Sequence, residues 1–469
     1  MKFITYSVRS IKMQAMALAG VVLLASCSKS LDPGIPNGSI GGDAVFTSDN
    51  SATSAVMAIY SYSYTYEFLK AQTIQTGLSS DELMYTMSSA TTDAAYAEFS
   101  VNNLTVGNTV LLPHWKNAYY VMAQINLAID GVTNSTGITA STKSLLLGEL
   151  KFWRAYIYFS MYNTFGPVPL IVSAGANDAE TNKYMPRTDS ATMFKQIFAD
   201  LTEAQSLLPV AYTGTLRGRV NKAVASALLA RLYLYQKDYA NAEAQAASVI
   251  GQTSTYSFMK DLTKVFKNAS TETIWQIPSY YGYSTVGYNY VTLTTTTLPP
   301  WYLNKAVYSS FDTADLRKAN WTSYVVNGTD TLRTITKYKL PSSTTAGDEA
   351  TVMMRLPEQY LIRAEARLKQ GNTSGATSDL DSVRVRAGLA LLSESLTADQ
   401  LMDEVMLQRK LELFGEQGHR WFDLKRTNRA ISELGASRPA LVSKPGHLLF
   451  PIPDNQRSLN TNLTQNNDY

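Results

Sequence analysis

The sequence predicts a mainly α-helical protein in which helical hairpins stack into a scaffold that one long loop-rich segment interrupts. Apolar residues recur every three or four positions over 141–165, which is the period of a helix face. Alanine-rich helical pairs are expected at 222–250 and again at 357–389. Between 251 and 351 the helical period disappears, and Thr, Tyr, Gly and Pro become frequent. We therefore expect this insertion to carry loops, short strands and occasional helical turns.

The segment 141–165 is predicted to be apolar on two sides. Its apolar positions fall into two groups, Leu146, Leu150, Trp153, Ile157 and Met161 on one face and Leu145, Phe152, Tyr156 and Phe159 on another. A helix with two apolar faces must pack on both, as happens when hairpins stack in layers. This helix ends at Gly166-Pro167, and Asp189 or Ser190 can cap the next one, which Pro209 ends.

The pair at 222–250 fits the tetratricopeptide pattern. Apolar and small residues stand at the offsets of that repeat, namely Leu229, Ala230, Tyr233, Tyr239, Ala242 and Ala246. The pair at 357–389 repeats the theme around a turn at Gly371-Asn372. The fold class is therefore tetratricopeptide-like helical hairpins.

Three further helices complete the predicted scaffold. Two precede the pairs, at about 51–69 and 112–131. The first contains tyrosines that alternate as in a strand, at Tyr60, Tyr62, Tyr64 and Tyr66, but we predict a helix. The last begins at Thr397, where Gln400 completes a capping box, and continues to Phe414.

The N-terminus has the pattern of a secretion signal. Residues 1–26 hold Lys2, Arg9 and Lys12 but no acid, followed by an apolar run of about twelve residues, whereas a membrane-spanning helix needs roughly 20. The run ends in Leu24-Ala25-Ser26-Cys27, which resembles the bacterial lipobox, and Cys27 is the single cysteine. We predict a signal peptide at 1–26, lipid on Cys27 (palmitate and related acyl chains), a flexible tether at 27–50 and one domain at 51–469.

Charge and composition exclude several function classes. The chain of 469 residues has 41 basic and 38 acidic residues, and loss of the three basic signal residues leaves 38 of each. A nucleic-acid protein needs a basic stripe, so nucleic acid is not an expected partner. One cysteine and three scattered histidines make a metal site or cofactor unexpected. No serine-hydrolase elbow, zinc-protease or phosphate-loop motif occurs, and we expect no enzyme activity.

The segment 273–304 is the main candidate for ligand binding. It contains no Asp, Glu, Lys or Arg in 32 residues and carries eight aromatic residues, more than twice the number that the chain-wide 11% predicts. Aromatic faces beside hydroxyl and amide groups suit a neutral sugar, whose C–H face stacks while its hydroxyls form hydrogen bonds. Trp275 is interpreted as a core residue. The predicted ligand-binding residues of this segment are Tyr281, Tyr283, Tyr288, Tyr290 and Trp301.

A second, weaker candidate is the Ser/Thr-rich stretch 79–103. Its predicted ligand-binding residues are Asp81, Tyr85 and Tyr96. For each of these rings the alternative is that it closes a hydrophobic layer over the helical core. His114 and His419 have no acid-base partner at a motif spacing, so both are interpreted as structural or surface residues.

Several motifs together give a resemblance to a known family. They are ELKFWRAYIYFSMYNTFGPVPL at 149–170, GRVNK at 218–222, EQYLIRAEA at 358–366, VRVRAGL at 383–389, QRKLELFGEQGHRWFDLKR at 408–426 and FPIP at 450–453. The chain thereby resembles the RagB/SusD (SusD-like) family of outer-membrane nutrient-uptake lipoproteins over nearly its whole mature length. Gln408 departs from the pattern, since the family has a glutamate before Arg409.

The resemblance implies a binding protein that faces the cell exterior. Its partners would be a glycan and a SusC-like TonB-dependent barrel transporter, to which it would deliver oligosaccharide or polysaccharide. The alternative is a tetratricopeptide-type lipoprotein that binds peptide or protein for a peptide uptake system. A peptide binder should line its groove with amide and charged groups, whereas the neutral tyrosine segment favours glycan.

Overall fold

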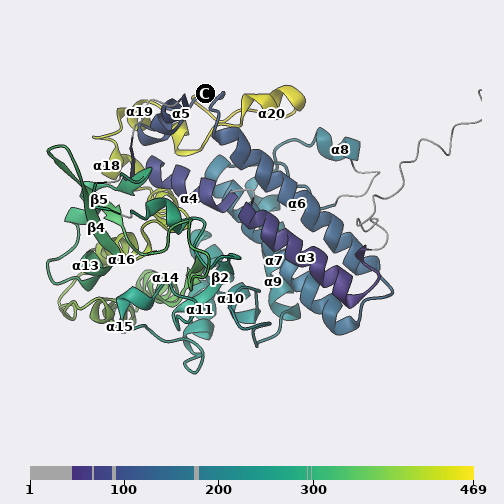
Figure 1. The fold of residues 1–469 in the computed structure, drawn as a ribbon, viewed down its shortest axis with the longest axis horizontal. Helices are drawn as coiled ribbons and strands as arrows, with labels where there is room; N and C mark the ends of the chain where they lie inside the picture. The colour runs from purple at the N-terminus through teal and green to yellow at the C-terminus, as the bar shows by residue number, and fades with distance from the viewer. Residues whose placement is uncertain (1–44, 66–67, 87–90, 174–178, 293, 297) are drawn as a thin grey trace, which may run out of the picture.

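The computed structural model describes residues 45–65, 68–86, 91–173, 179–292, 294–296 and 298–469. It confirms the mainly helical fold with few short strands. The long helices of the first half lie side by side, strands β4 (Thr322–Asn327) and β5 (Asp330–Ile335) lie at the opposite end of the molecule, and β2 (Thr273–Pro278) lies between them (Figure 1). Residues 1–44, with the predicted signal and Cys27, and also Tyr66, lie outside the described residues.

The first half of the chain supplies a layer of long helices. Their bounds are α3 (Asp49–Thr65), α4 (Phe68–Ser79), α5 (Thr91–Ser100), α6 (Leu111–Asn134), α7 (Ala140–Phe165), α8 (Ala179–Lys183) and α9 (Ser190–Leu207). α7 contacts α6, α9 and α3, and Leu150, Phe152 and Trp153 are all fully buried. Packing on both sides of α7 is thereby confirmed. The Asp189 side chain caps α9 by accepting a hydrogen bond from the Thr192 amide at 2.9 Å.

The second half continues the stack with hairpins. Their helices are α10 (Lys222–Tyr235), α11 (Tyr239–Ile250), α14 (Leu356–Lys369), α15 (Thr373–Arg386) and α16 (Ala398–Leu413). α11 packs on α14, so the two alanine-rich pairs are neighbours although a hundred residues separate them in the sequence. The capping box of Thr397 and Gln400 is present at the start of α16. Short helices follow, α17 (His419–Arg426), α18 (Ala430–Leu434), α19 (Pro439–Ser443), η4 (Pro445–Leu448) and α20 (Asp454–Leu459).

The insertion between α11 and α14 contains the expected short strands and helical turns. Its elements are η2 (Leu262–Lys264), β2 (Thr273–Pro278), η3 (Gly287–Tyr290), β3 (Trp301–Leu303), α12 (Lys305–Ser309), α13 (Leu316–Trp321), β4 (Thr322–Asn327), β5 (Asp330–Ile335) and β6 (Ala350–Arg355). β2 and β6 form an antiparallel pair, while β1 (Leu83–Tyr85) joins a sheet of order β1-β3-β5-β4. Trp275 of β2 is fully buried, as expected.

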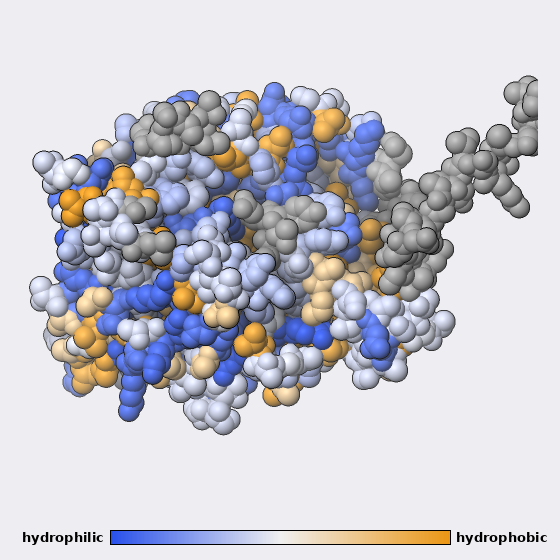
Figure 2. Space-filling view, in the orientation of Figure 1, coloured by the Kyte–Doolittle hydropathy of each residue, from blue (hydrophilic) through white to orange (hydrophobic). Residues whose placement is uncertain are grey.

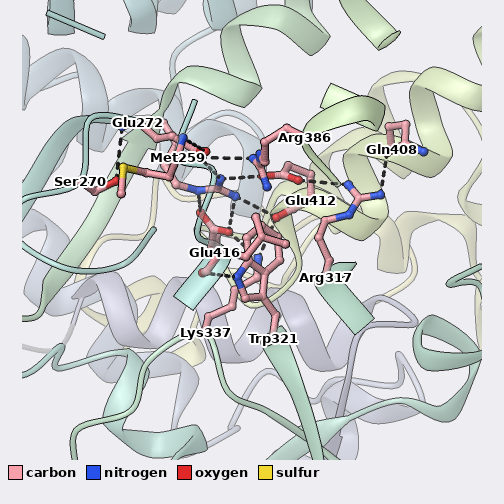
Figure 3. A network of polar contacts seen from close by, with 12 residues as sticks. Met259, Ser270, Glu272, Arg317, Trp321, Lys337, Arg386, Gln408, Glu412 and Glu416 are labelled. Carbon is pink, nitrogen blue, oxygen red and sulfur yellow. Dashed lines mark hydrogen bonds and ion pairs between the residues drawn. The ribbon is translucent and has the colours of Figure 1, made fainter. Parts of the chain in front are cut away.

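A buried network of charges joins the insertion to the helical scaffold (Figure 3). Glu412 at the end of α16 accepts from Arg317 of α13 at 3.0 Å and from Arg355 of β6 at 2.7 Å, and it also pairs with Arg386 of α15. Glu416 accepts from Arg355 at 2.8 Å and from Lys337 at 2.6 Å. Glu412 in the last turn of α16 and Glu416 just after this helix therefore hold α13, β6 and Lys337 of the insertion together with the end of α15.

The network keeps its charges despite burial. Burial opposes the charge of Glu412, but Arg386, Arg355 and Arg317 hold the pKa of this carboxyl below its usual range. Burial lowers the pKa of Lys337 to about 8, against the opposing attraction of Glu416. Each charge thus depends on its partners, and loss of one partner leaves a buried charge uncompensated.

Gln408 lies at the edge of the network. Its amide oxygen accepts a hydrogen bond from Arg317 at 2.8 Å, and Arg317 also pairs with Asp315 at 2.7 Å. The amide therefore occupies the position of a third acceptor around Arg317. Two carboxylates, those of Asp315 and Glu412, still compensate this arginine.

Replacing Arg355 tests how much the network contributes to stability. Arg355→Met should lower the free energy of unfolding by about 3–5 kcal/mol, because Glu412 and Glu416 lose a buried partner. Urea unfolding of the purified protein, followed by tryptophan fluorescence, measures the change. Lys264→Met is the control, since Lys264 pairs with Asp261 at 3.6 Å on the surface, and it should change stability little. Equal effects of the two substitutions would contradict the central role of the network.

Candidate ligand-binding surface

Four tyrosines form a partly exposed row directly after β2. Tyr280, Tyr281, Tyr283 and Tyr288, called the tyrosine ladder below, have successive ring centroids 5.0, 6.4 and 5.7 Å apart. The rings of Tyr281 and Tyr283 are parallel, with an interplanar angle of 1°. Tyr280 is 94% exposed and Tyr281 is 46% exposed, while Tyr283 and Tyr288 are half-buried. The row therefore offers ring faces and edges to solvent.

The backbone that carries the ladder is held tightly. Ser279 Oγ donates to the Tyr283 carbonyl at 2.7 Å and accepts from the Tyr283 amide at 3.0 Å, which closes a turn. Gly282 in this turn has φ +73°, and a Cβ there would lie 2.1 Å from the carbonyl oxygen of Gly347. Only glycine fits this close approach without strain. The Gly347 amide donates to the Tyr281 carbonyl at 2.9 Å, so the turn is fixed to the segment before β6.

The ladder has the chemistry of a sugar platform. Its four phenol hydroxyls form no hydrogen bond with the described part of the chain, so all four remain available to a ligand. Aromatic rings stack on apolar faces, and each such contact is worth about 1 kcal/mol by analogy with aromatic pairs. Several rings in a row are therefore needed for useful affinity.

A second aromatic cluster unites the other candidates. Tyr85 of β1, Tyr96 of α5 and Trp301 of β3 pack together, with ring centroids 5.2 Å apart for the tyrosine pair and 5.6 Å apart for Tyr96 and Trp301. The Lys70 ammonium lies 5.9 Å from the Trp301 ring centroid. Trp301 is only 6% exposed, whereas Tyr85 and Tyr96 are half-buried. Trp301 thus supports the two tyrosines more than it offers a surface of its own.

The ladder and this cluster lie on neighbouring elements. η3, which carries Tyr288, contacts β3, which carries Trp301. The backbone amide of Asn304, just after β3, donates to the backbone carbonyl of Glu82 at 2.9 Å. This hydrogen bond joins the 79–103 stretch to the insertion. The two sequence candidates, about two hundred residues apart, therefore meet at the same end of the molecule.

Tyr290 is not part of this surface. It is 1% exposed, and its ring lies beside Gly415. Burial raises the pKa of Tyr290 well above its usual range. Tyr290 and Tyr288 are only two residues apart, but the 3₁₀ turn of η3 directs one into the core and leaves the other half-exposed.

Asp81 forms ion pairs with two cations of the helical scaffold. Its carboxylate accepts from Arg420 Nε at 2.7 Å and from Lys410 at 2.9 Å. Burial opposes ionisation, but Arg420 and Lys410 hold the pKa of Asp81 below its usual range. The charge is compensated by two cations, so Asp81 joins the loop after α4 to α16 and α17 rather than serving a ligand.

Sequence reasoning left out Tyr280, the most exposed ring of the ladder. It stands in the same neutral aromatic segment as the other candidates and directly follows Pro278-Ser279. Because Tyr280 follows the last residue of β2, it lies outside the sheet. On the face shown in Figure 2, hydrophobic residues form small patches separated by hydrophilic ones.

A cavity beside α15 is lined by no residue of the ladder. It has a volume of about 900 Å³ and lies between α15 and residues 391–401, with Phe258 and Tyr360 among its lining residues. Serine and threonine hydroxyls of α15 line one wall, and Leu391, 68% exposed, lies on the other. This mixture of aliphatic and hydroxyl groups differs from the aromatic row of the ladder.

The described residues offer no metal site and no membrane span. No group of three or more His, Cys, Asp or Glu side chains among them is placed to hold a metal ion. Burial lowers the pKa of His114 to about 3 and also lowers that of His419. Within the same residues, no helix is both long and apolar enough to cross a bilayer.

Comparison with family models finds two matches that together extend over most of the chain. A model of the SusD family matches residues 279–469. A second model, described as starch-binding associating with outer membrane, matches residues 52–234. The ladder, the cavity beside α15 and the C-terminal motifs fall in the first match, and Asp81, Tyr85 and Tyr96 fall in the second.

Individual relatives and solved structures agree with these matches. SusD-like protein P2 of Formosa agariphila is 26% identical over 425 residues, which cover 78% of this chain and 82% of the relative. The structure of a laminarin binding SusD-like protein superposes with a TM-score of 0.74 at 23% identity, covering 90% of this chain and all of the other. Surface glycan-binding protein A from Bacteroides uniformis gives a TM-score of 0.75 at 20% identity and covers 89% and 99% of the two chains.

The buried carboxyl of Glu82 makes the stability of the folded protein depend on pH. Burial raises the pKa of Glu82 from 4.5 to about 7, against a hydrogen bond from the Gly415 amide. Between these two pH values the folded protein keeps a proton that the unfolded chain releases, so stability should fall by about 3 kcal/mol as the pH rises from 4.5 to 7.

Urea unfolding at a series of pH values tests this expectation. In Glu82→Gln the stability should fall less across the same window, because the amide does not ionise. The exposed Glu394→Gln should keep the wild-type slope. Identical slopes for Glu82→Gln and the wild type would show that Glu82 does not titrate there.

Proposed function

Because the chain belongs to the SusD-like family, we propose that it is an outer-membrane lipoprotein that captures oligosaccharide or polysaccharide on the tyrosine ladder. The observation that carries the proposal is the ladder itself, in which Tyr280 and Tyr281 are exposed beside the half-buried Tyr283 and Tyr288. The segment 273–304 around it holds no charged residue. A neutral sugar loses no ionic hydration on entering such a site.

Binding proceeds by contact, with no bond made or broken. The parallel rings of Tyr281 and Tyr283 receive the C–H faces of sugar rings, while the phenol hydroxyls exchange hydrogen bonds with sugar hydroxyls. The turn fixed by Gly282 and Gly347 presents these rings before ligand arrives, which reduces the entropy lost on binding. Tyr85 of β1 and Tyr96 of α5, on the far side of β3 from η3, extend the surface for a longer chain of sugars.

Delivery to a transporter is the second part of the proposal. The bound glycan would pass to a SusC-like TonB-dependent barrel, over which the protein sits on the cell exterior. The family match described as associating with outer membrane supports this location. Acyl chains on Cys27 and the tether at 27–50 would hold the domain at the membrane, because two or more acyl chains give stable anchoring.

A peptide ligand is the less supported alternative. The ladder segment lacks the charged groups that charged side chains of a peptide would pair with, and two solved relatives are named for laminarin and for glycan. The cavity beside α15 is the place where a peptide would lie, since Leu391 offers an aliphatic contact there.

Ladder variants test the proposed platform. A glycan array first identifies a neutral polysaccharide that the wild type binds, and calorimetry then measures its affinity. Tyr281→Ala and Tyr283→Ala should each weaken binding about fivefold, and the double variant about 30-fold, if each ring contributes about 1 kcal/mol. Tyr184→Ala is the matched control, since Tyr184 is 44% exposed and lies outside the ladder. Unchanged binding by the double variant would refute the platform.

The anchor has its own test. Cys27→Ser should release the protein from the outer-membrane fraction of expressing cells, because the residue that carries lipid is lost. Metabolic labelling with palmitate should mark the wild type and not the variant. Labelling of both proteins, or membrane retention of the unlabelled variant, would contradict anchoring at Cys27.

A further inference from the structure

A second pocket lies on the face of the strand pair β1–β3 opposite the aromatic cluster. It has a volume of about 550 Å³, and its lining residues are Met84, Tyr302, Leu303, Asn304, Lys305, Tyr308, Ser309 and 329–333. In β1 and β3, Met84 pairs with Tyr302, and Tyr85 pairs with Trp301. Successive side chains of a strand point to opposite faces, so the pocket and the aromatic cluster are back to back.

Two cations of the pocket lining, Lys305 and Arg333, lie near the ring of Tyr308 or beside it in the sequence, and a third cation, Lys318, contacts that ring from outside the lining. The guanidinium of Arg333 lies 3.9 Å from the ring centroid of Tyr308, and the Lys318 ammonium lies 5.0 Å from the same ring. Lys305, at the start of α12, also lines the pocket and is exposed. None of these three cations has a carboxylate within 4.0 Å among the described residues.

This arrangement contrasts with the arginines of the interior. Arg317, Arg355 and Arg386 each pair with at least one carboxylate in the buried network. Around Tyr308, by comparison, cations crowd one ring, and Asp330 is the single acid that lines the pocket. Like charges at such distances repel one another, and a bound anion relieves that repulsion.

The position of Arg333 is fixed by the fold. Arg333 stands in the middle of β5, paired with Leu303 of β3 on one side and with Tyr324 of β4 on the other. Its stacking on Tyr308 orients the guanidinium before any ligand arrives, and a planar guanidinium matches the geometry of a carboxylate or an oxyanion. Lys305, Thr329 and Asp330 line the pocket and are exposed, so the pocket opens to solvent.

We propose that this cationic pocket, formed by Lys305, Arg333, Tyr302 and Tyr308, binds an acidic sugar unit that bears a carboxylate or a sulfate group. Lys305 and Arg333 receive the anion. The half-buried ring of Tyr302 and the hydroxyls of Ser309, Thr329 and Thr331 contact the rest of the sugar. The class of ligand rests on the proposed glycan function, but the site is separate from the ladder.

A nucleic acid fits the pocket poorly. Such a ligand needs a basic stripe that follows its backbone, and the chain after the predicted signal carries equal numbers of basic and acidic residues. A free sulfate or phosphate ion shares the anionic chemistry but would leave Tyr302 and the hydroxyls without a role. Inorganic sulfate alone is therefore a separate arm of the test.

The test uses one glucan in matched forms. Laminarin, laminarin oxidised to a uronate at C6, laminarin sulfate and inorganic sulfate are titrated separately into the full-length protein in detergent, with calorimetric detection. The two charged glucans should bind more tightly than laminarin at low salt, and the difference should vanish at about 1 M salt, where the Debye length is about 3 Å. Equal affinity of charged and neutral glucans at low salt would overturn the proposal.

Substitutions in the pocket show whether the preference for charged glucans arises there. Arg333→Met, which keeps an aliphatic contact with Tyr308, should weaken binding of the charged glucans about 10-fold or more, since a hydrogen bond to a charged group contributes about 1.5–3 kcal/mol. Lys305→Met should act in the same direction. Lys195→Met, at an exposed lysine of α9, is the matched control and should change nothing. An unchanged preference for charged glucans in the Lys305→Met, Arg333→Met double variant, with circular dichroism confirming its fold, would refute the site.

The outcomes separate this site from the ladder. If the ladder fails as a glycan platform, Tyr281→Ala leaves laminarin binding unchanged, while the difference between charged and neutral glucans still depends on Arg333. If the pocket fails, the ladder variants still lose laminarin and Arg333→Met has no effect. Inorganic sulfate binding as tightly as the charged glucans would show that the pocket holds a free ion and not a sugar.

Discussion

The buried charges around Glu412 and Glu416 are the constraint on which the rest of the structure depends. Glu412 lies in the last turn of α16 and Glu416 four residues later, and together they hold Arg317, Lys337 and Arg355 of the insertion. The insertion also packs apolar side chains, among them Trp275, Trp321 and Tyr338, into the main core, and the ion pairs add direction to that contact. These ion pairs in a dry interior favour one position of the insertion, because each unpaired charge would cost several kcal/mol.

This constraint reaches the ligand surface through two strands. Arg355 is the last residue of β6, and β6 pairs with β2 in antiparallel register. β2 ends at Pro278, and the ladder begins two residues later. The other end of β6 is preceded by Gly347, which holds the turn at Gly282. The backbone that carries the tyrosine rings is therefore connected to the buried charges through β6 and β2, and a rigid surface of this kind loses little entropy on binding.

Local sequence signals predicted the scaffold well, because helix periodicity, caps and turns are local. The capping box at Thr397, the cap at Asp189 and the burial of Trp275 are all present. The direction in which each aromatic ring points is not a local property. Tyr290 is buried because it packs beside Gly415, more than a hundred residues later, while its neighbour Tyr288 is half-exposed.

The role of a charged candidate residue is also not a local property of the sequence, because its partners can lie far away along the chain. Asp81 stands in a polar stretch that resembles a binding loop, and its partners Lys410 and Arg420 lie more than three hundred residues away. The tertiary fold alone reveals that its charge is already compensated. Composition found the neutral aromatic segment but did not separate its exposed rings, above all Tyr280, from those that support them.

A crystal structure with a bound neutral oligosaccharide would show directly whether the ladder holds the ligand. We expect a sugar ring stacked on Tyr281 or Tyr283, with sugar hydroxyls within hydrogen-bond distance of the phenol groups. Sugar bound in the cavity beside α15, with the ladder unoccupied, would contradict this expectation.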